Sequence, residues 1–197
     1  MKRVALVTGG NKGIGFHVAE QLLATCSLVI LACRDAGRGD AAVAKLAAPN
    51  AKMMVLDISD GGSIDSFAAA YEKEVGQLDV LVNNAAIAFK GADPTPFEGQ
   101  TGPTLKTNYY GTVALTERLL PLVRKSENGC VVNVASMAGK LAQVSPARQA
   151  AFTSPDLTKE KLDALVAEFA SDVAAGRHKQ VGWGNSNYGF SKLCVIA

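Results

Sequence analysis

Residues 4–15 read VALVTGGNKGIG, an apolar run that leads directly into a glycine-rich turn. An apolar run bounded by glycine is typical of a buried strand, and the residues after the turn have helical spacing. Glycines at this point allow a sharp turn and let a pyrophosphate approach backbone amides at the N-terminus of a helix. The stretch therefore predicts a strand, a phosphate-binding turn and a helix. An ordinary tight turn is the alternative, because a glycine-rich turn alone is a weak signal.

Short apolar or β-branched runs alternate with longer segments of helical spacing along the rest of the chain. This alternation is typical of a parallel sheet with helices on both faces. Right-handed crossovers then predict an α/β fold of three layers, a doubly wound, Rossmann-like sheet with a ligand crevice at the carboxyl ends of its strands. The expected strands are 4–8, 28–32, 52–56, 80–83 and 130–134, and the expected helices are 14–24, 38–46, 63–75 and 104–125.

The interval 137–187 has no strand signal. Within it, five apolar residues from Leu162 to Val173 recur at helical spacing, with Thr158 as a candidate N-cap and Gly176 after the last turn. The pattern predicts an inserted amphipathic helix.

Length and composition exclude several classes of protein. With 197 residues, 48% hydrophobic and 19% charged, the chain has the balance of one globular domain over 1–197. A net charge of +2 without a basic run gives no reason to expect nucleic acid or an anionic membrane as a partner. No apolar stretch reaches the roughly 20 residues of a membrane span, and the four cysteines lack metal-ligand spacing. We expect a cytoplasmic protein with reduced thiols and no metal.

Basic residues stand where a dinucleotide-binding fold meets the adenosine ribose. Arg34 follows the second strand and Lys12 lies in the glycine-rich turn. Both would attract a 2′-phosphate, whereas an acidic side chain would repel it, so NADP(H) is favoured over NAD. The alternative for Arg34 is a solvated charge at a strand end.

Polar residues follow the third and fourth strands at the same crevice. Asp57, followed by Ile58, is placed to accept from the adenine amino group, and Asn84 ends the fourth strand. Each residue alone also fits an ordinary turn.

Tyr188 and Lys192 are four residues apart and share one face of a helix. A phenol, with a pKa of about 10, becomes a useful proton-transfer group when a neighbouring cation favours its anion. The alternative is a surface pair on an amphipathic helix.

Several motifs occur together and resemble the short-chain dehydrogenase/reductase family, most closely its NADPH-dependent carbonyl reductases. The resemblance runs along essentially the whole chain. Its carriers are TGGNKGIG at 8–15, LVNNA at 81–85, KTN at 106–108, VVNVAS at 131–136 and YGFSK at 188–192, with FK at 89–90 and ADPTPF at 92–97.

The resemblance implies an oxidoreductase that reduces ketones, aldehydes or quinones. Tyr188 would protonate the carbonyl oxygen, Ser136 would polarise it, Lys192 would bind the nicotinamide ribose, and Asn108 would support a proton relay. Phe89 and Lys90 would lie near the substrate mouth, although surface residues are the alternative there, and the 137–187 insertion implies a monomer. The cofactor-binding residues would be Gly9, Asn11, Lys12, Gly13, Ile14, Gly15, Arg34, Asp57, Ile58, Asn84, Tyr188 and Lys192.

The chain departs from the family pattern in two places. Ala86 stands where the family usually has glycine, and nine residues follow Tyr188, whereas the resemblance implies a sixth strand and a Pro-Gly turn beyond that helix. We therefore expect a domain that is shortened after its fifth strand and the start of the next helix. A non-catalytic NADP-binding or interaction protein is the alternative function.

Overall fold

The computed structural model describes residues 3–197 and divides the chain into two compact units. The first unit holds the residues up to Ala86 together with Tyr110–Val134, and the second holds Ile87–Tyr109 together with Ala135–Ala197. The expectation of a single domain over 1–197 stays a prediction.

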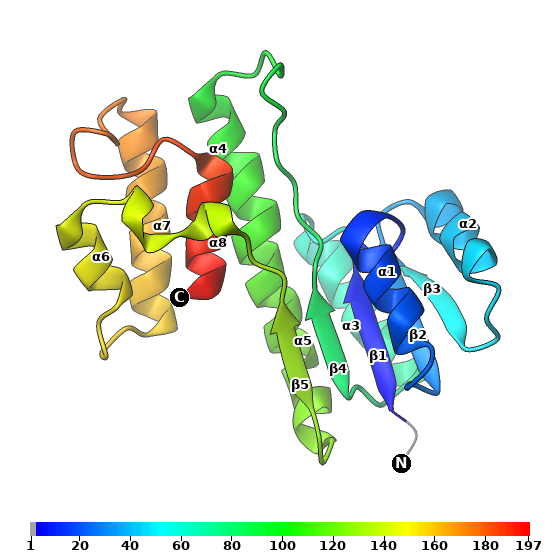
Figure 1. Ribbon diagram of the computed structural model, residues 1–197. Coiled ribbons are helices and arrows are strands. Elements are labelled where there is room, and N and C mark those ends of the chain that lie inside the picture. Colours follow the sequence, from blue (N-terminus) through cyan, green and yellow to red (C-terminus); the bar gives the residue numbers. More distant parts are fainter. Residues whose placement is uncertain (1–2) are drawn as a thin grey trace. The chain divides into compact units, whose positions relative to one another are not determined.

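The first unit is built on a parallel five-stranded sheet with the order β3-β2-β1-β4-β5 (Figure 1). The order reverses beside β1, which pairs with both β2 and β4, so the carboxyl end of β1 lies at the switch point of the sheet. The predicted doubly wound parallel sheet is confirmed. The strands are β1 (Val4–Thr8), β2 (Leu28–Cys33), β3 (Ala51–Val55), β4 (Val80–Asn83) and β5 (Cys130–Asn133).

Helices cover both faces of this sheet because side chains alternate along its buried strands. In β1, Ala5 and Val7 belong to a cluster with Phe16 and Ala42 of two helices, whereas Leu6 belongs to a cluster on the opposite face. The first face carries α1 (Gly13–Leu22) and α2 (Ala36–Leu46), and the second carries α3 (Gly61–Glu74) and α5 (Thr112–Lys125).

Asp79 links the amino ends of β1, β4 and β5 in this unit. Its Oδ2 accepts from the Val4 amide at 2.7 Å and from Gln77 Nε2 at 2.8 Å, and its Oδ1 accepts from the Ser126 hydroxyl. Burial alone would raise the pKa of Asp79, but these hydrogen bonds outweigh it and lower the pKa. The carboxylate thereby joins the start of β1 to the segments before β4 and β5.

The expected helix over 104–125 is wrong in its extent. The segment consists of α4 (Phe97–Leu105), a π-helix (Lys106–Gly111) and then α5. A Cβ at Gly111 would overlap the Ile58 carbonyl, so glycine lets the start of α5 lie against that backbone. A tertiary contact of this kind does not change the spacing of apolar residues, so the sequence pattern could not predict where the helix is interrupted.

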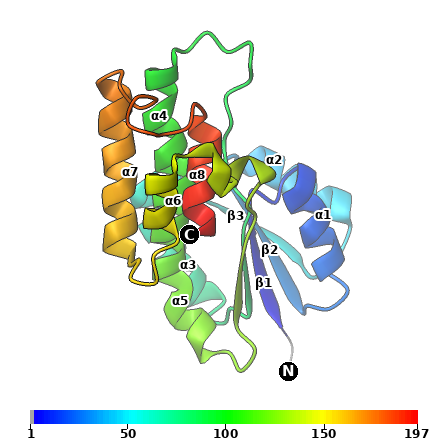
Figure 2. The same ribbon diagram turned by 60° about the vertical axis from the view of Figure 1, so that its left-hand side comes forward.

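The second unit is helical among its described elements, as the absence of strand signals in 137–187 predicts. Helix α4 lies beside α7 and α8 (Figure 2). The predicted inserted helix is confirmed as α7: Thr158 accepts from the Lys161 amide at 3.4 Å, and Gly176 beyond its end has φ +67°. The unit also contains the unpredicted short helix α6; the bounds are α6 (Pro146–Phe152), α7 (Lys159–Ala174) and α8 (Asn187–Ile196).

An aromatic cluster forms the core of this second unit. The rings of Phe169 and Phe190 stack with centroids 3.8 Å apart, and Trp183 meets both edge-on at 5.8 and 5.4 Å. Edge-on and stacked pairs of buried rings add to the energy of area burial. The cluster therefore joins α7, α8 and the loop that precedes α8.

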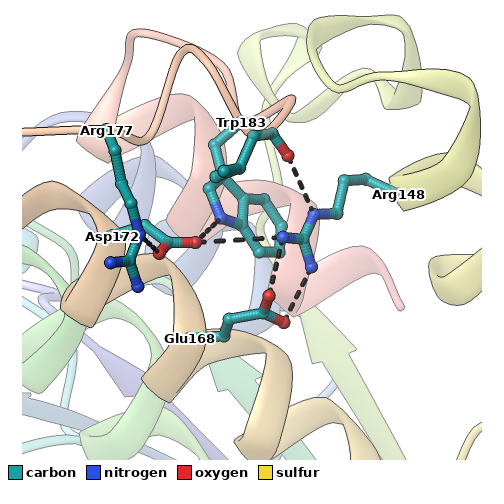
Figure 3. A network of polar contacts seen from close by, with 6 residues as sticks. Arg148, Glu168, Asp172, Arg177 and Trp183 are labelled. Carbon is teal, nitrogen blue, oxygen red and sulfur yellow. Dashed lines mark hydrogen bonds and ion pairs between the residues drawn. The ribbon is translucent and has the colours of Figure 1, made fainter.

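A charged network lies against this cluster (Figure 3). Asp172 accepts from Trp183 Nε1 at 2.8 Å and from Arg177 Nε at 2.7 Å, and its side chain is only 4% exposed. Arg148 lies over the Trp183 ring at 3.9 Å and donates two hydrogen bonds to Glu168, both at 2.7 Å. The network therefore ties α6 to α7 and to the loop after α7.

Candidate active site

The glycine-rich turn connects β1 to α1 in the first unit. Gly9 and Gly13 have φ of +65° and +57°, in the left-handed region that favours glycine. A Cβ at Gly15 would lie 2.6 Å from the Gly9 carbonyl oxygen, so this position also requires glycine. The predicted succession of strand, glycine-rich turn and helix is confirmed, and the binding of a phosphate there stays a prediction.

The first amides of α1 lack a side-chain cap, and its first turn carries no acidic residue. Uncapped amides and the helix dipole suit an anion. Around them, Asn11 is half-buried, Lys12 is exposed, and Ile14 is 66% exposed. A cationic and an apolar side chain beside uncapped amides fit a dinucleotide.

Hydrogen bonds of Thr8 and Asn84 hold this turn against the segment after β4. The buried Thr8 hydroxyl accepts from the amides of Asn84 and Ala85, both at 2.9 Å. The Asn84 side-chain amide donates to the Thr8 carbonyl at 2.8 Å and to the Gly9 carbonyl at 3.4 Å. The structure thus places Asn84, a predicted cofactor residue, in support of the turn. Sequence reasoning gave Thr8 no role, although a threonine between an apolar run and the glycine-rich turn was the available signal.

Two arginines are exposed at the carboxyl end of β2. Arg34 follows the strand, and Arg38 lies in the first turn of α2. The intervening acid, Asp35, caps that helix by accepting from the Arg38 amide at 2.8 Å. The Arg38 guanidinium also pairs with that carboxylate, Nε to Oδ2 at 3.8 Å, whereas the exposed charge of Arg34 fits a 2′-phosphate. Sequence reasoning did not consider Arg38.

Asp57 and Ile58 follow β3 and lie in different environments. Asp57 Oδ1 accepts from the Ser59 amide at 2.9 Å and from the Ser59 hydroxyl at 2.6 Å. The Ile58 side chain is 6% exposed and packs in the core. The Ile58 side chain is therefore not placed to meet a ligand.

In the second unit, α8 carries Tyr188 and Lys192 one turn apart. The Lys192 Nζ lies 5.8 Å from the centre of the Tyr188 ring, and Lys192 is 5% exposed. Burial lowers the pKa of Lys192 because it disfavours the charged ammonium. A cation in such surroundings acts more strongly on a nearby phenol than one in water. Ser186 caps this helix by accepting from the Gly189 amide at 2.9 Å.

Ser136 begins a 3₁₀ turn (Met137–Gly139) that packs directly on α8. A Cβ at Gly139 would lie 2.8 Å from the Lys192 carbonyl carbon, and one at Gly189 would lie 2.8 Å from the Ala138 carbonyl oxygen. The Ser136 Oγ accepts from the Ala138 amide at 3.1 Å, which leaves its own proton to be donated elsewhere. Glycine on both surfaces lets the serine turn reach the helix.

Asn108 lies in the π-helix and is 1% exposed. Its Oδ1 accepts from the Ile87 amide at 2.8 Å, and its Nδ2 donates to the Ile87 carbonyl at 2.9 Å and to Ser191 Oγ at 3.0 Å. Ser191 donates in turn to the Tyr188 carbonyl at 2.8 Å. The Asn108 side chain therefore fixes α8, with both amide protons engaged.

The four residues that were expected to carry the chemistry all belong to the second unit. Asn108, Ser136, Tyr188 and Lys192 are joined there by α8 and the segments packed on it. Phe89 is half-buried and Lys90 is exposed, in the irregular segment between β4 and α4 of the chain. The expected cofactor residues before position 85 belong to the first unit.

Two kinds of feature are absent from residues 3–197. No helix in that range is long and apolar enough to cross a membrane. Likewise, within the same residues, no group of three or more His, Cys, Asp or Glu side chains is placed to hold a metal ion.

Comparisons with known proteins agree with one another. Residues 3–176 match the family described as short chain dehydrogenase. The chain is 46% identical to the NADPH carbonyl reductase 1 of Macaca fascicularis over 98% of its length and 71% of that protein. Among solved structures, menthone neomenthol reductase from Mentha piperita is 30% identical with a TM-score of 0.89, covering 99% of this chain and 82% of that one. Salutaridine reductase from Papaver somniferum is 31% identical, also with a TM-score of 0.89, over 98% and 79% of the two chains.

Proposed function

The chain belongs to the short-chain dehydrogenase family, and from that premise we propose that it reduces carbonyl compounds with NADPH. Its membership of this family and its similarity to carbonyl reductases identify the chain as an oxidoreductase. Ketones, aldehydes and quinones are the proposed substrates.

The proposed cofactor is NADP(H), which supplies the reducing equivalent when bound. The turn from Gly9 to Gly15 offers uncapped amides to the pyrophosphate, together with Asn11 and the exposed Lys12 and Ile14. Arg34 accounts for the preference for a 2′-phosphate, with Arg38 beside it. The Ile58 backbone and the Asp57 carboxylate are assigned to the adenine.

Tyr188 is the proposed proton donor to the carbonyl oxygen, and Ser136 donates a hydrogen bond to the same oxygen. The Ser136 proton is free for this purpose because the Oγ lone pair is held by the Ala138 amide. Charge develops on the carbonyl oxygen as it is reduced, so two preorganised donors stabilise the transition state more than the substrate. Water would have to reorient to give the same stabilisation.

Lys192 has two proposed roles, binding of the nicotinamide ribose and stabilisation of the Tyr188 anion. Its position one turn from Tyr188 and its burial suit the second role. Asn108 is assigned to orientation of α8 in support of the proton relay, because its side-chain amide is engaged by Ile87 and Ser191.

One observation carries the proposal: the turn that begins at Ser136 packs on the helix that presents Tyr188 and Lys192. A serine, a tyrosine and a lysine scattered over a surface would have no common chemistry. Because glycine stands at both points of contact, the backbone of the turn and that of the helix can approach closely.

The proposal is tested by following NADPH absorbance with a quinone and a ketone. We expect Tyr188→Phe to lower kcat by about 10²- to 10⁴-fold, the usual contribution of a positioned acid. Tyr110→Phe is the matched control, since Tyr110 is 42% exposed and has no proposed role. Equal rates for the parent and Tyr188→Phe would refute the assignment.

A chain that binds NADPH without turnover over a broad carbonyl panel would instead be a non-catalytic NADP-binding protein. NADPH at 100 times its Kd should stabilise the folded chain by about 2.7 kcal/mol, which a thermal shift measures. The monomeric state and the cytoplasmic location remain predictions, and light scattering of the purified chain checks the first.

A further inference from the structure

The Gln143 side chain lies between the serine turn and the tyrosine helix of the second unit. Its Nε2 is 3.0 Å from the Ala138 carbonyl oxygen, 3.1 Å from that of Lys140, and 3.2 Å from that of Gly189. The first two carbonyls belong to the segment after Ser136, and the third belongs to the residue after Tyr188. One amide group therefore donates to both segments that carry the proposed catalytic donors.

The packing around Gln143 is close on the helix side. A Cβ at Gly189 would lie 2.7 Å from the Gln143 Oε1, and one at Gly184 would lie 3.4 Å from the same atom. Two glycines thus leave room for this amide, which an alanine at Gly189 would displace. The side chain is held in one place by neighbours on both sides.

The contact reaches the serine hydroxyl through one residue, Ala138. The Ala138 amide donates to Ser136 Oγ at 3.1 Å, and the Ala138 carbonyl accepts from Gln143. The amide and the carbonyl lie in adjacent peptide groups that share the Ala138 Cα, so a displacement of Ala138 affects both hydrogen bonds. The position of Ser136 Oγ is therefore linked through Ala138 to the Gln143 amide.

We propose that Gln143 is a positioning residue that sets Ser136 and Tyr188 at a fixed separation, an inference that rests on the proposed function. Two donors aimed at one carbonyl oxygen must keep their spacing to within a fraction of an ångström. Gln143 supplies the hydrogen bonds that join them and touches no reacting atom.

The test compares Gln143→Met with Gln149→Met. Methionine keeps the length of the side chain and removes the amide. The matched control is Gln149, in the same unit, which also donates to a backbone carbonyl, that of Val144 at 2.8 Å, but joins neither donor segment to the other. We expect Gln143→Met to lower kcat by about 10- to 100-fold, the scale of a misplacement near 1 Å, and Gln149→Met to leave kcat within about twofold.

A double-mutant cycle with Ser136→Ala separates positioning from general loss of structure. If Gln143 acts through the serine, adding Gln143→Met to Ser136→Ala should lower kcat little further. A kcat of the double variant equal to the product of the two separate losses would overturn the inference. Equal kcat losses for the two methionine variants would overturn it as well.

Hydrogen exchange tests the link itself without any turnover. We expect Gln143→Met to lose amide protection across residues 136–140 while α7 keeps its protection, and unchanged protection of 136–140 would overturn the inference. If the parent binds NADPH but shows no turnover, the proposed function fails, and the exchange result alone still decides whether Gln143 holds the turn on the helix.

Discussion

The substitution Asp172→Asn removes one charge from the centre of the network in the second unit and changes the shape of the side chain very little. Asp172 is 3% exposed and accepts from Trp183 and Arg177 at 2.8 and 2.7 Å, with Arg148 3.8 Å away. An asparagine oxygen can accept from one of the two close donors, but its NH₂ group then faces the other. One buried donor is left without an acceptor, and the arginines lose their shared anion.

The cost follows from these contacts. A hydrogen bond to a charged group contributes about 1.5–3 kcal/mol, and removal of one partner from a buried ion pair costs about 3–5 kcal/mol. The Arg177 side chain is 55% exposed, so water compensates it in part. We therefore expect Asp172→Asn to lower the free energy of unfolding by about 2–4 kcal/mol.

Glu168→Gln is the matched control because it changes a carboxylate on the same network. The Glu168 side chain is 47% exposed, although both of its hydrogen bonds to Arg148 are 2.7 Å long. Exposed pairs contribute about 0–1 kcal/mol even when they are short. A cost for Glu168→Gln equal to that of Asp172→Asn would refute the argument that burial decides the magnitude.

Urea unfolding measures both variants, and fluorescence of Trp183, the single tryptophan of the chain, reports on this network. The Trp183 hydrogen bond, together with the Arg177 hydrogen bond and the charges of Arg177 and Arg148, lowers the pKa of Asp172 against the opposing effect of burial. Because the unfolded pKa is about 3.9 and the folded pKa is lower, the stabilisation is complete above about pH 4 and disappears as the pH falls through the folded pKa. The difference between parent and Asp172→Asn should shrink in that acidic range, and a constant difference down to pH 3 would contradict the assignment.

Two further predictions concern the cofactor turn and the adenosine edge. Arg34→Ala should raise the Kd for NADPH by about 10- to 100-fold and leave that for NADH unchanged, with Arg124→Ala as an exposed control; equal changes for both nucleotides in a binding titration would remove the 2′-phosphate role. Gly15→Ala should abolish the NADPH-induced rise in Tm, because its Cβ would lie 2.6 Å from the Gly9 carbonyl oxygen. Gly62→Ala, whose Cβ would lie 3.8 Å from its nearest neighbour, should retain that rise; a full rise in Gly15→Ala would show that the turn tolerates a side chain.

The centre of the sheet was predictable from the sequence because β1, β2 and β4 are buried and read as continuous apolar runs. The bounds of β1 and β4 agree with the prediction, since glycine follows the first run and a pair of asparagines closes the second. The other three strands differ by one residue at one or both ends. The family resemblance drawn from the motifs is confirmed by the match over residues 3–176.

The helical segment that contains Asn108 was harder to predict. The predicted helix over 104–125 included the π-helix and left out most of α4, because the π-helix is set by neighbours rather than by periodicity. Gly111 meets the Ile58 backbone, and Asn108 bonds to Ile87 and Ser191. Neither contact can be found from spacing along the chain, because each partner is distant in sequence.

The candidate site likewise has parts that follow from spacing along the chain and parts that depend on contacts between residues distant in sequence. Tyr188 and Lys192 were paired correctly from sequence, since a separation of four residues places two side chains on one helical face. Gly139 and Gly189 carried no such signal, because a glycine is required at each only by the backbone that lies opposite. The sequence could therefore place Tyr188 and Lys192 on one helical face, but it could not predict that the turn after Ser136 packs on that helix. A tyrosine one turn from a lysine is common on helical surfaces, whereas here Gly139, Gly189 and the Gln143 amide also join that helix to the turn after Ser136.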